Sequence, residues 1–203
     1  MNILKMYPTS INEKYMDIIV ASLRDGGIIV YPTDTLYAIG CNALNNQAIE
    51  KICKLKGINP LKTNLSIICC DISQASEYAR IDNRAFKLMR DNLPGAFTFV
   101  LPVASTLPKA FKGRKTVGVR IPDNLIAREI VARLGNPILT TSIEWEEEMY
   151  EDAVNPDSIA MRYDGFADFL IDGGEGGTVP STVVDLLDSF SPEIIRDGLG
   201  VLV

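Results

Sequence analysis

The chain has 203 residues, of which 47% are hydrophobic and 23% are charged, a composition typical of one globular domain or at most two small ones. No apolar run approaches the roughly 20 residues that a membrane-spanning helix needs, and the first residues, MNILKMYPTS, offer too short an apolar stretch for a signal peptide. We therefore expect a cytoplasmic protein that forms a single domain over residues 1–203.

The sequence contains no histidine, which excludes Ser-His-Asp and Cys-His catalysis and every histidine-based zinc site. None of the four cysteines (Cys41, Cys53, Cys69 and Cys70) forms a C-x-x-C pair, so we expect buried free thiols. An acidic run from Glu144 to Asp152 is interpreted as a solvated loop rather than a metal site. Any chemistry must then use carboxylates, hydroxyls, Lys, Arg, backbone amides or a metal carried by a ligand.

The net charge of −6 conceals a strong segregation of charge along the chain. Residues 51–133 hold 15 of the 20 Lys and Arg but only 6 of the 26 Asp and Glu, so this basic segment carries +9 and the other residues carry −15. Such a distribution favours a basic surface or cleft for an anionic partner. Chance clustering on solvated helix faces is the alternative.

Four helices are predicted from apolar spacing and terminal residues. Ser10 and Glu13 have the spacing of a capping box for a helix that runs to about Arg24. Asn46 opens a second helix that stops at Gly57, and Asp82 caps a third. A fourth helix covers about 124–134 and ends at Gly135.

Short apolar runs between these helices predict strands. They cover residues 27–31, 65–70, 97–102, 116–122, 137–142, 167–172, 182–187 and a short last segment at 192–198. Strands that alternate with helices indicate an α/β fold. Because the link between 97–102 and 116–122 is too short or irregular for a helical crossover, we expect a mixed parallel and antiparallel sheet.

Polar residues cluster where several of these strands end. They are Thr33-Asp34-Thr35, Arg120, Thr140-Thr141-Ser142, Ser181-Thr182 after the glycine-rich DGGEGGTVP, and Arg196. The first cluster lies in YPTDTLYAIGC at 31–41, which is equally consistent with a simple turn and with a ligand loop at the carboxyl end of a strand. The glycine-rich loop matches neither a P-loop nor a dinucleotide-binding fingerprint.

The order and spacing of five motifs resemble the YrdC-like family. PTDTLYAIGC is similar to its PT-[DE]-T-x-Y-x-x-G-C signature, and PGAFTFVL at 94–101 to its P-G-x-x-T-x-V-L segment. VGVRIPDN, PSTVVDL and IIRDG complete a resemblance that covers about residues 10–200. It implies an open twisted sheet with helices on both faces and a large concave basic cavity. It also implies synthesis of threonylcarbamoyl-AMP from L-threonine, bicarbonate and ATP with Mg²⁺. This product serves the threonylcarbamoyladenosine modification of tRNA. The resemblance further implies binding of double-stranded RNA or tRNA.

The resemblance also implies roles for individual residues. Thr33, Thr35, Arg120 and Ser181 are expected to bind threonine, with Arg120 on its carboxylate. Lys56, Ser142 and Arg196 are expected to bind the nucleotide. Adenylation of a carbamate needs positioning and charge neutralisation rather than a protein nucleophile, so the missing histidine is no obstacle.

Two departures separate this chain from the synthases. The family's K-x-R motif reads Lys56-Gly57-Ile58, and its S-x-N motif reads Ser142-Ile143-Glu144. Together with KICKLK, NPLKTNLSIICCDIS and TTSIEW, they resemble the YciO branch. The alternatives are therefore a weakened synthase, a non-catalytic RNA-binding module that has lost this activity, and, more remotely, a hydrolase that uses Asp34 and Glu144 with Mg²⁺.

Overall fold

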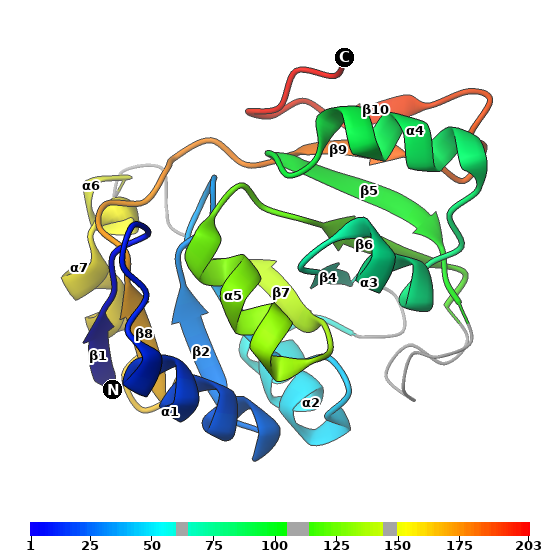
Figure 1. Ribbon diagram of the computed structural model, residues 1–203. Helices are drawn as coiled ribbons and strands as arrows, with labels where there is room; N and C mark the ends of the chain where they lie inside the picture. Colours follow the sequence, from blue (N-terminus) through cyan, green and yellow to red (C-terminus); the bar gives the residue numbers. More distant parts are fainter. Residues whose placement is uncertain (60–64, 105–113, 144–149) are drawn as a thin grey trace.

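The structure is a computed structural model that describes residues 1–59, 65–104, 114–143 and 150–203 (Figure 1). Part of the acidic run, Glu144 included, lies outside these ranges. No helix in the described ranges has the length and apolar character needed to cross a bilayer.

Seven helices are described, in chain order α1 Glu13–Arg24, α2 Asn46–Leu55, α3 Ile72–Tyr78, α4 Asn83–Asn92, α5 Leu125–Leu134, α6 Tyr150–Val154 and α7 Pro156–Arg162. The predicted capping box is wrong, because the Asn12 side chain accepts the N-terminal hydrogen bond of α1 and Ser10 lies outside the helix. Asp82 caps α4 as predicted, by accepting from the backbone N–H groups of Arg84 and Ala85. Gly135 ends α5 in the left-handed conformation that glycine adopts without strain, with φ of 82°.

Ten described strands form one sheet. They are β1 Asn2–Lys5, β2 Ile28–Tyr31, β3 Ala38–Asn42, β4 Ser66–Ile68, β5 Phe97–Pro102, β6 Thr116–Arg120, β7 Ile138–Ser142, β8 Phe169–Asp172, β9 Thr182–Asp185 and β10 Glu193–Arg196. Their order is β1-β8-β2-β3-β7-β4-β6-β5-β9-β10. The sheet contains both parallel pairs such as β4–β6 and antiparallel pairs such as β5–β6, which confirms the predicted open mixed sheet. The sequence interpretation missed β1 and β3.

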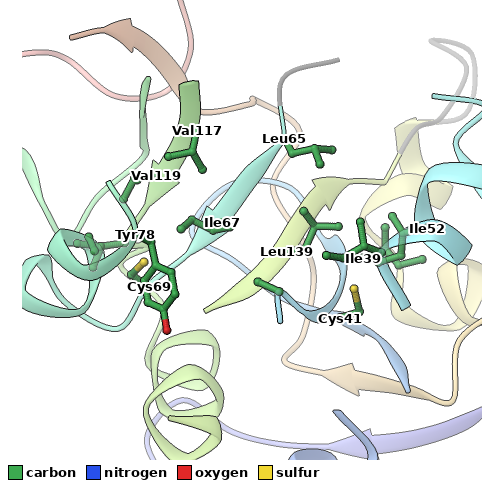
Figure 2. Close-up of a cluster of buried hydrophobic side chains, with 14 of the residues drawn as sticks. Ile39, Cys41, Ile52, Leu65, Ile67, Cys69, Tyr78, Val117, Val119 and Leu139 are labelled. Atoms are coloured by element: carbon green, nitrogen blue, oxygen red, sulfur yellow. The ribbon is translucent and has the colours of Figure 1, made fainter. Parts of the chain in front are cut away.

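Each face of the sheet is covered by its own hydrophobic cluster. On one face, α1 and α5 lie side by side (Figure 1) and bury residues such as Leu23 and Ile130 against β2 and β7. On the other face, α2, α3, α4 and α7 cover a larger cluster. Figure 2 shows part of this cluster. Ile67, Val119 and Leu139 from three adjacent strands lie on the side of the sheet that Ile52 of α2 and Tyr78 of α3 cover. The expected helices on both faces are thus present.

All four cysteines are free thiols, as predicted. Cys41, Cys53 and Cys69 are buried, whereas Cys70 is half-buried. Cys41 and Cys69 belong to the larger cluster in Figure 2, where they serve as apolar packing groups.

Candidate functional site

A row of small or apolar residues crosses the centre of the sheet and forms the floor of a cavity. The strand register places Thr140 of β7 beside Ser66 of β4, Ser66 beside Gly118 of β6, and Gly118 beside Val100 of β5. A side chain at Gly118 would collide with Ser66, because its Cβ would lie 2.4 Å from the Ser66 Oγ. Small side chains on this part of the face therefore leave the cavity, of about 340 Å³, open above the strands. That volume is at the small end of ligand-binding sites.

Six of the seven predicted site residues line this cavity. They are Thr35, Lys56, Arg120, Ser142, Ser181 and Arg196. The seventh, Thr33, is absent from the lining and lies behind Thr35, with its Oγ1 3.1 Å from the Thr35 Oγ1. These six residues come from separate elements of the chain and meet in one cavity, although their roles in binding stay predictions.

Arg120, at the end of β6, is the buried cation of the site. Only 7% of the residue is exposed. Its Nη2 donates to Oδ1 of Asp34 at 3.1 Å and to Oγ1 of Thr35 at 2.9 Å, while its Nε is buried without an acceptor in the described structure. Burial lowers the pKa of Arg120, opposed by the nearby Asp34 and Tyr31, but a guanidinium stays protonated in proteins. The residue therefore combines a buried positive charge with an unsatisfied donor.

The threonines of the 32–37 loop are held in place by local hydrogen bonds. Thr33 Oγ1 accepts from the backbone N–H of Thr35 at 3.0 Å and donates to the carbonyl oxygen of Leu36 at 2.7 Å. The glycine-rich loop lies against the same segment, since the N–H of Gly177 donates to the Thr35 carbonyl oxygen at 2.8 Å. A Cβ at Gly177 would lie 2.4 Å from that oxygen, so this approach requires glycine. The segment thus forms a tight turn that presents Thr35 to the cavity, and its role as a ligand loop stays a prediction.

Arg196 and Ser181 form a second polar group on the β9–β10 side. Arg196 donates through Nη2 and Nε to the backbone oxygen of Ser181, at 2.7 and 3.2 Å. The Ser181 Oγ lies 2.8 Å from the Oγ1 of Thr98 in β5. Burial lowers the pKa of Arg196, but a guanidinium stays protonated in proteins, so the cavity wall keeps this positive charge.

Lys56 and Ile58 enter the cavity from the end of α2. The Lys56 Nζ donates to the backbone oxygen of Ser142 at 3.1 Å. Ile58 lines the same cavity and packs its apolar side chain partly against the larger hydrophobic cluster. Ile58, which stands at the arginine position of the K-x-R motif, is thus an apolar part of the cavity wall.

Several cavity residues were not predicted as site residues, namely Ser66, Thr98, Gly118, Thr140 and Thr141. They lie on strands that the sequence interpretation identified, but only the register shows that they share one face. The Thr140-Thr141-Ser142 cluster was the one available signal in the sequence.

The lining contains hydroxyl groups and three cations but no carboxylate among the described residues. The described parts of the chain also contain no group of three or more Cys, Asp and Glu suited to hold a metal. The Asp34 carboxylate accepts from Arg120 and from the backbone N–H of Asp123 at 2.9 Å. Both of its oxygens are therefore engaged, which disfavours Asp34 as a metal ligand of a hydrolase.

These features define an α/β protein with an open mixed sheet and a cationic, hydroxyl-lined cavity at the sheet's centre. The chain belongs to the Sua5/YciO/YrdC family, described as "telomere recombination", which matches residues 21–198. The resemblance to YrdC-like proteins inferred from the motifs is thereby confirmed.

Among its relatives, the uncharacterized protein YciO of Escherichia coli is 36% identical over 197 residues, which cover 96% of this chain and 94% of YciO. The crystal structure of E. coli YciO superposes with a TM-score of 0.90 over 99% of this chain and 98% of that one. These values agree with the predicted similarity to the YciO branch.

The threonylcarbamoyl-AMP synthase of Bacillus subtilis is 31% identical over 93% of this chain and 55% of its own length. P. abyssi Sua5, solved in complex with L-threonine, is 28% identical, with a TM-score of 0.84 over 98% of this chain and 58% of Sua5. The present chain therefore spans little more than half the length of these two proteins.

Proposed function

We propose that this protein binds L-threonine and an adenine nucleotide in the cavity, and that it joins them with bicarbonate into threonylcarbamoyl-AMP more slowly than the synthases of its family. The observation that carries this proposal is Arg120, a buried cation with an unsatisfied Nε, set among five other predicted ligand residues. A buried donor without a partner destabilises a protein by about 1–3 kcal/mol, which an incoming carboxylate oxygen would relieve.

The threonine carboxylate is assigned to Arg120, whose charge supplies a strong, charge-assisted hydrogen bond. The hydroxyls of Thr35 and Ser181 line the same cavity and can exchange hydrogen bonds with the polar groups of the amino acid. Thr33 contributes indirectly, since it orients Thr35 through the hydrogen bonds of the turn. The proposal is supported by the bound L-threonine of P. abyssi Sua5.

The nucleotide phosphates are assigned to Lys56 and Arg196, with Ser142 beside Lys56. Because the described lining offers no carboxylate to a metal, Mg²⁺ would enter as part of the Mg-ATP substrate. There it neutralises phosphate charge as pyrophosphate leaves.

The proposed reaction needs no side-chain nucleophile. The amine of threonine and bicarbonate form a carbamate with loss of water, a carbamate oxygen attacks the α-phosphorus of ATP, and the bond to the departing pyrophosphate breaks. The residues of this chain hold the reactants in line and stabilise the negative charge that develops on the phosphates.

An alternative function is a non-catalytic module that binds double-stranded RNA or tRNA. It is favoured by Ile58, which supplies no charge to a polyphosphate, and by the +9 of the basic segment 51–133. In the synthase proposal, the same basic segment would bind the tRNA that receives the product.

One experiment separates these functions. The purified protein is incubated with labelled threonine, bicarbonate and Mg-ATP, and threonylcarbamoyl-AMP and pyrophosphate are measured. Formation of both products, lost in Arg120→Ala, supports the synthase. Binding of threonine and ATP without formation of either product would support the non-catalytic module instead.

A further inference from the structure

Asp34 lies outside the cavity lining, yet its carboxylate forms an ion pair with Arg120, the buried cation of the cavity. Its Oδ1 accepts from Nη2 of Arg120 at 3.1 Å, and its Oδ2 accepts from the backbone N–H of Asp123 at 2.9 Å. The Asp34 and Arg120 side chains are only 10% and 9% exposed. The ion pair is therefore shielded from solvent and salt, unlike a surface pair.

This contact joins distant parts of the sheet. Asp34 follows β2 and Arg120 ends β6, and β3, β7 and β4 lie between these two strands in the sheet. Asp123 immediately precedes Asn124, the N-cap of α5. One carboxylate thus fastens the 32–37 loop both to the end of β6 and to the beginning of α5.

The contact also fixes the orientation of the guanidinium. Nη2 carries two hydrogens, and both have acceptors, in Oδ1 of Asp34 and Oγ1 of Thr35. Because the guanidinium is planar and rigid, holding Nη2 also sets the direction of the N–H on Nε. Nε is the donor that has no acceptor in the described structure.

We propose that Asp34 is the positioning residue of the site, which orients Arg120 so that its remaining donors meet the carboxylate of the ligand. This inference rests on the proposed function, in which Arg120 binds that carboxylate. Asp34 itself does not contact the ligand, since both of its oxygens already have donors.

Positioning and simple electrostatics predict opposite effects of removing the Asp34 charge. If Asp34 acted only as a negative charge near the cavity, its loss would strengthen the binding of an anionic group. If it holds Arg120 in place, its loss weakens binding, although the site becomes more positive. The sign of the change therefore distinguishes the two roles.

Three variants make this comparison. Asp34→Asn keeps the size of the side chain, but an amide has one oxygen and one NH₂ group to face two donors, so it can satisfy only one of them. Asp34→Glu keeps the charge and displaces the carboxylate by one methylene, which avoids an uncompensated Arg120 should Asp34→Asn fold poorly. Asp123→Asn is the matched control, because it removes the same charge from a side chain that is 69% exposed and leaves intact the backbone N–H that Asp34 binds.

The first measurement is calorimetric titration of each folded variant with L-threonine. We expect wild type and Asp123→Asn to bind equally, and Asp34→Asn and Asp34→Glu to bind at least about tenfold more weakly. Equal or tighter binding by the Asp34 variants would overturn the proposal. A wild-type protein that does not bind threonine would instead overturn the proposed function.

The second measurement needs no ligand. The Nε–H signal of Arg120 in a ¹⁵N–¹H spectrum reports the environment and solvent exchange of that donor. We expect Asp34→Asn and Asp34→Glu to shift this signal and to speed its exchange, and Asp123→Asn to leave it unchanged. An unchanged signal in both Asp34 variants would show that Asp34 does not hold Arg120, whether or not threonine binds.

Discussion

The Nζ of Lys56 lies 3.1 Å from the backbone oxygen of Ser142, although the two residues belong to the ends of α2 and β7. This contact brings together the lysine of the K-x-R position and the serine of the S-x-N position. Ile58 lines the same cavity two residues after Lys56. A substitution at Ile58, the arginine position of the K-x-R motif, therefore tests directly whether a charge there affects nucleotide binding.

Replacing Ile58 with arginine should strengthen ATP binding by about tenfold or more, because a charge-assisted hydrogen bond contributes about 1.5–3 kcal/mol. Isothermal titration with Mg-ATP measures the change. Leu55→Arg is the matched control, because it adds the same charge three residues earlier, at a side chain that is 40% exposed and absent from the cavity lining. Equal gains in both variants would mean that general charge, and not this position, limits nucleotide binding.

The double variant Ile58→Arg with Glu144→Asn should form threonylcarbamoyl-AMP faster than wild type. A single positioned group that stabilises transition-state charge is worth about 2.7–4 kcal/mol, or about 10²–10³ in rate. Under the proposed function both positions face the same polyphosphate, so the effects of the two substitutions are expected to couple rather than add. Pyrophosphate release from the two single variants and the double variant measures the coupling. If turnover stays at the wild-type level, other residues separate this chain from the synthases.

Binding of double-stranded RNA should weaken steeply between low and moderate salt, because contacts to the phosphate backbone release counterions. Arg84 and Lys87, both exposed on α4 in the basic segment, offer a local test. Arg84→Ala with Lys87→Ala should reduce affinity and the salt slope, whereas Lys5→Ala with Lys14→Ala, outside that segment, should not. An affinity for RNA that does not depend on salt would exclude binding of the RNA phosphate backbone by the basic segment.

Stability should depend on Asn12 and not on Ser10. Asn12→Ala removes the side chain that caps α1 and should lower the free energy of unfolding by about 1 kcal/mol. Ser10→Ala should change it by less than about 0.5 kcal/mol, since Ser10 is exposed and outside the helix. Urea denaturation of both variants measures the difference, and a larger loss in Ser10→Ala would restore the capping box inferred from the sequence.

Cys70 should be the first thiol to react with a disulfide reagent in the native protein. Burial raises the pKa of all four thiols, which lowers the reactive thiolate fraction at neutral pH. Only Cys70 is half-buried rather than buried. Its rate should increase as the pH rises from 7 towards its raised pKa, and Cys70→Ser should remove the fast phase. Two equally fast thiols in the wild type would contradict the described burial.

Most of the sheet was predictable, because each buried strand is an apolar run bounded by turn residues. β3 was missed since AIGCN contains glycine and asparagine, which are uncommon in strands, and follows the polar turn of the 32–37 loop. The cap of α1 was misplaced because Ser10-x-x-Glu13 satisfies the pattern of a capping box. Asn12 has no Glu or Gln three residues later, and only its hydrogen bond from the Tyr15 N–H shows that it is the cap. Local patterns therefore located the longer helices and most strands, but the short helices α3, α6 and α7 were not predicted.

The site was predictable only in part. The motif resemblance predicted Arg120, Ser181 and Arg196 as site residues, because each lies in a family motif at or beside one end of a strand. Ser66 and Gly118 carry no such signal, and they join the cavity floor through a register that pairs β4 with β6. The pairing of Asp34 with Arg120 likewise depends on tertiary structure, since 86 residues separate them in the sequence.

The most direct test of the proposed site is calorimetric titration with L-threonine of wild type, Arg120→Ala and Arg128→Ala. Arg128 is the matched control, because it is a partly exposed arginine on α5 that pairs with Asp123 and is absent from the cavity lining. The site predicts binding by wild type and Arg128→Ala and a loss of at least about tenfold in Arg120→Ala, equivalent to about 1.5–3 kcal/mol. Equal affinity of wild type and Arg120→Ala for threonine would contradict it.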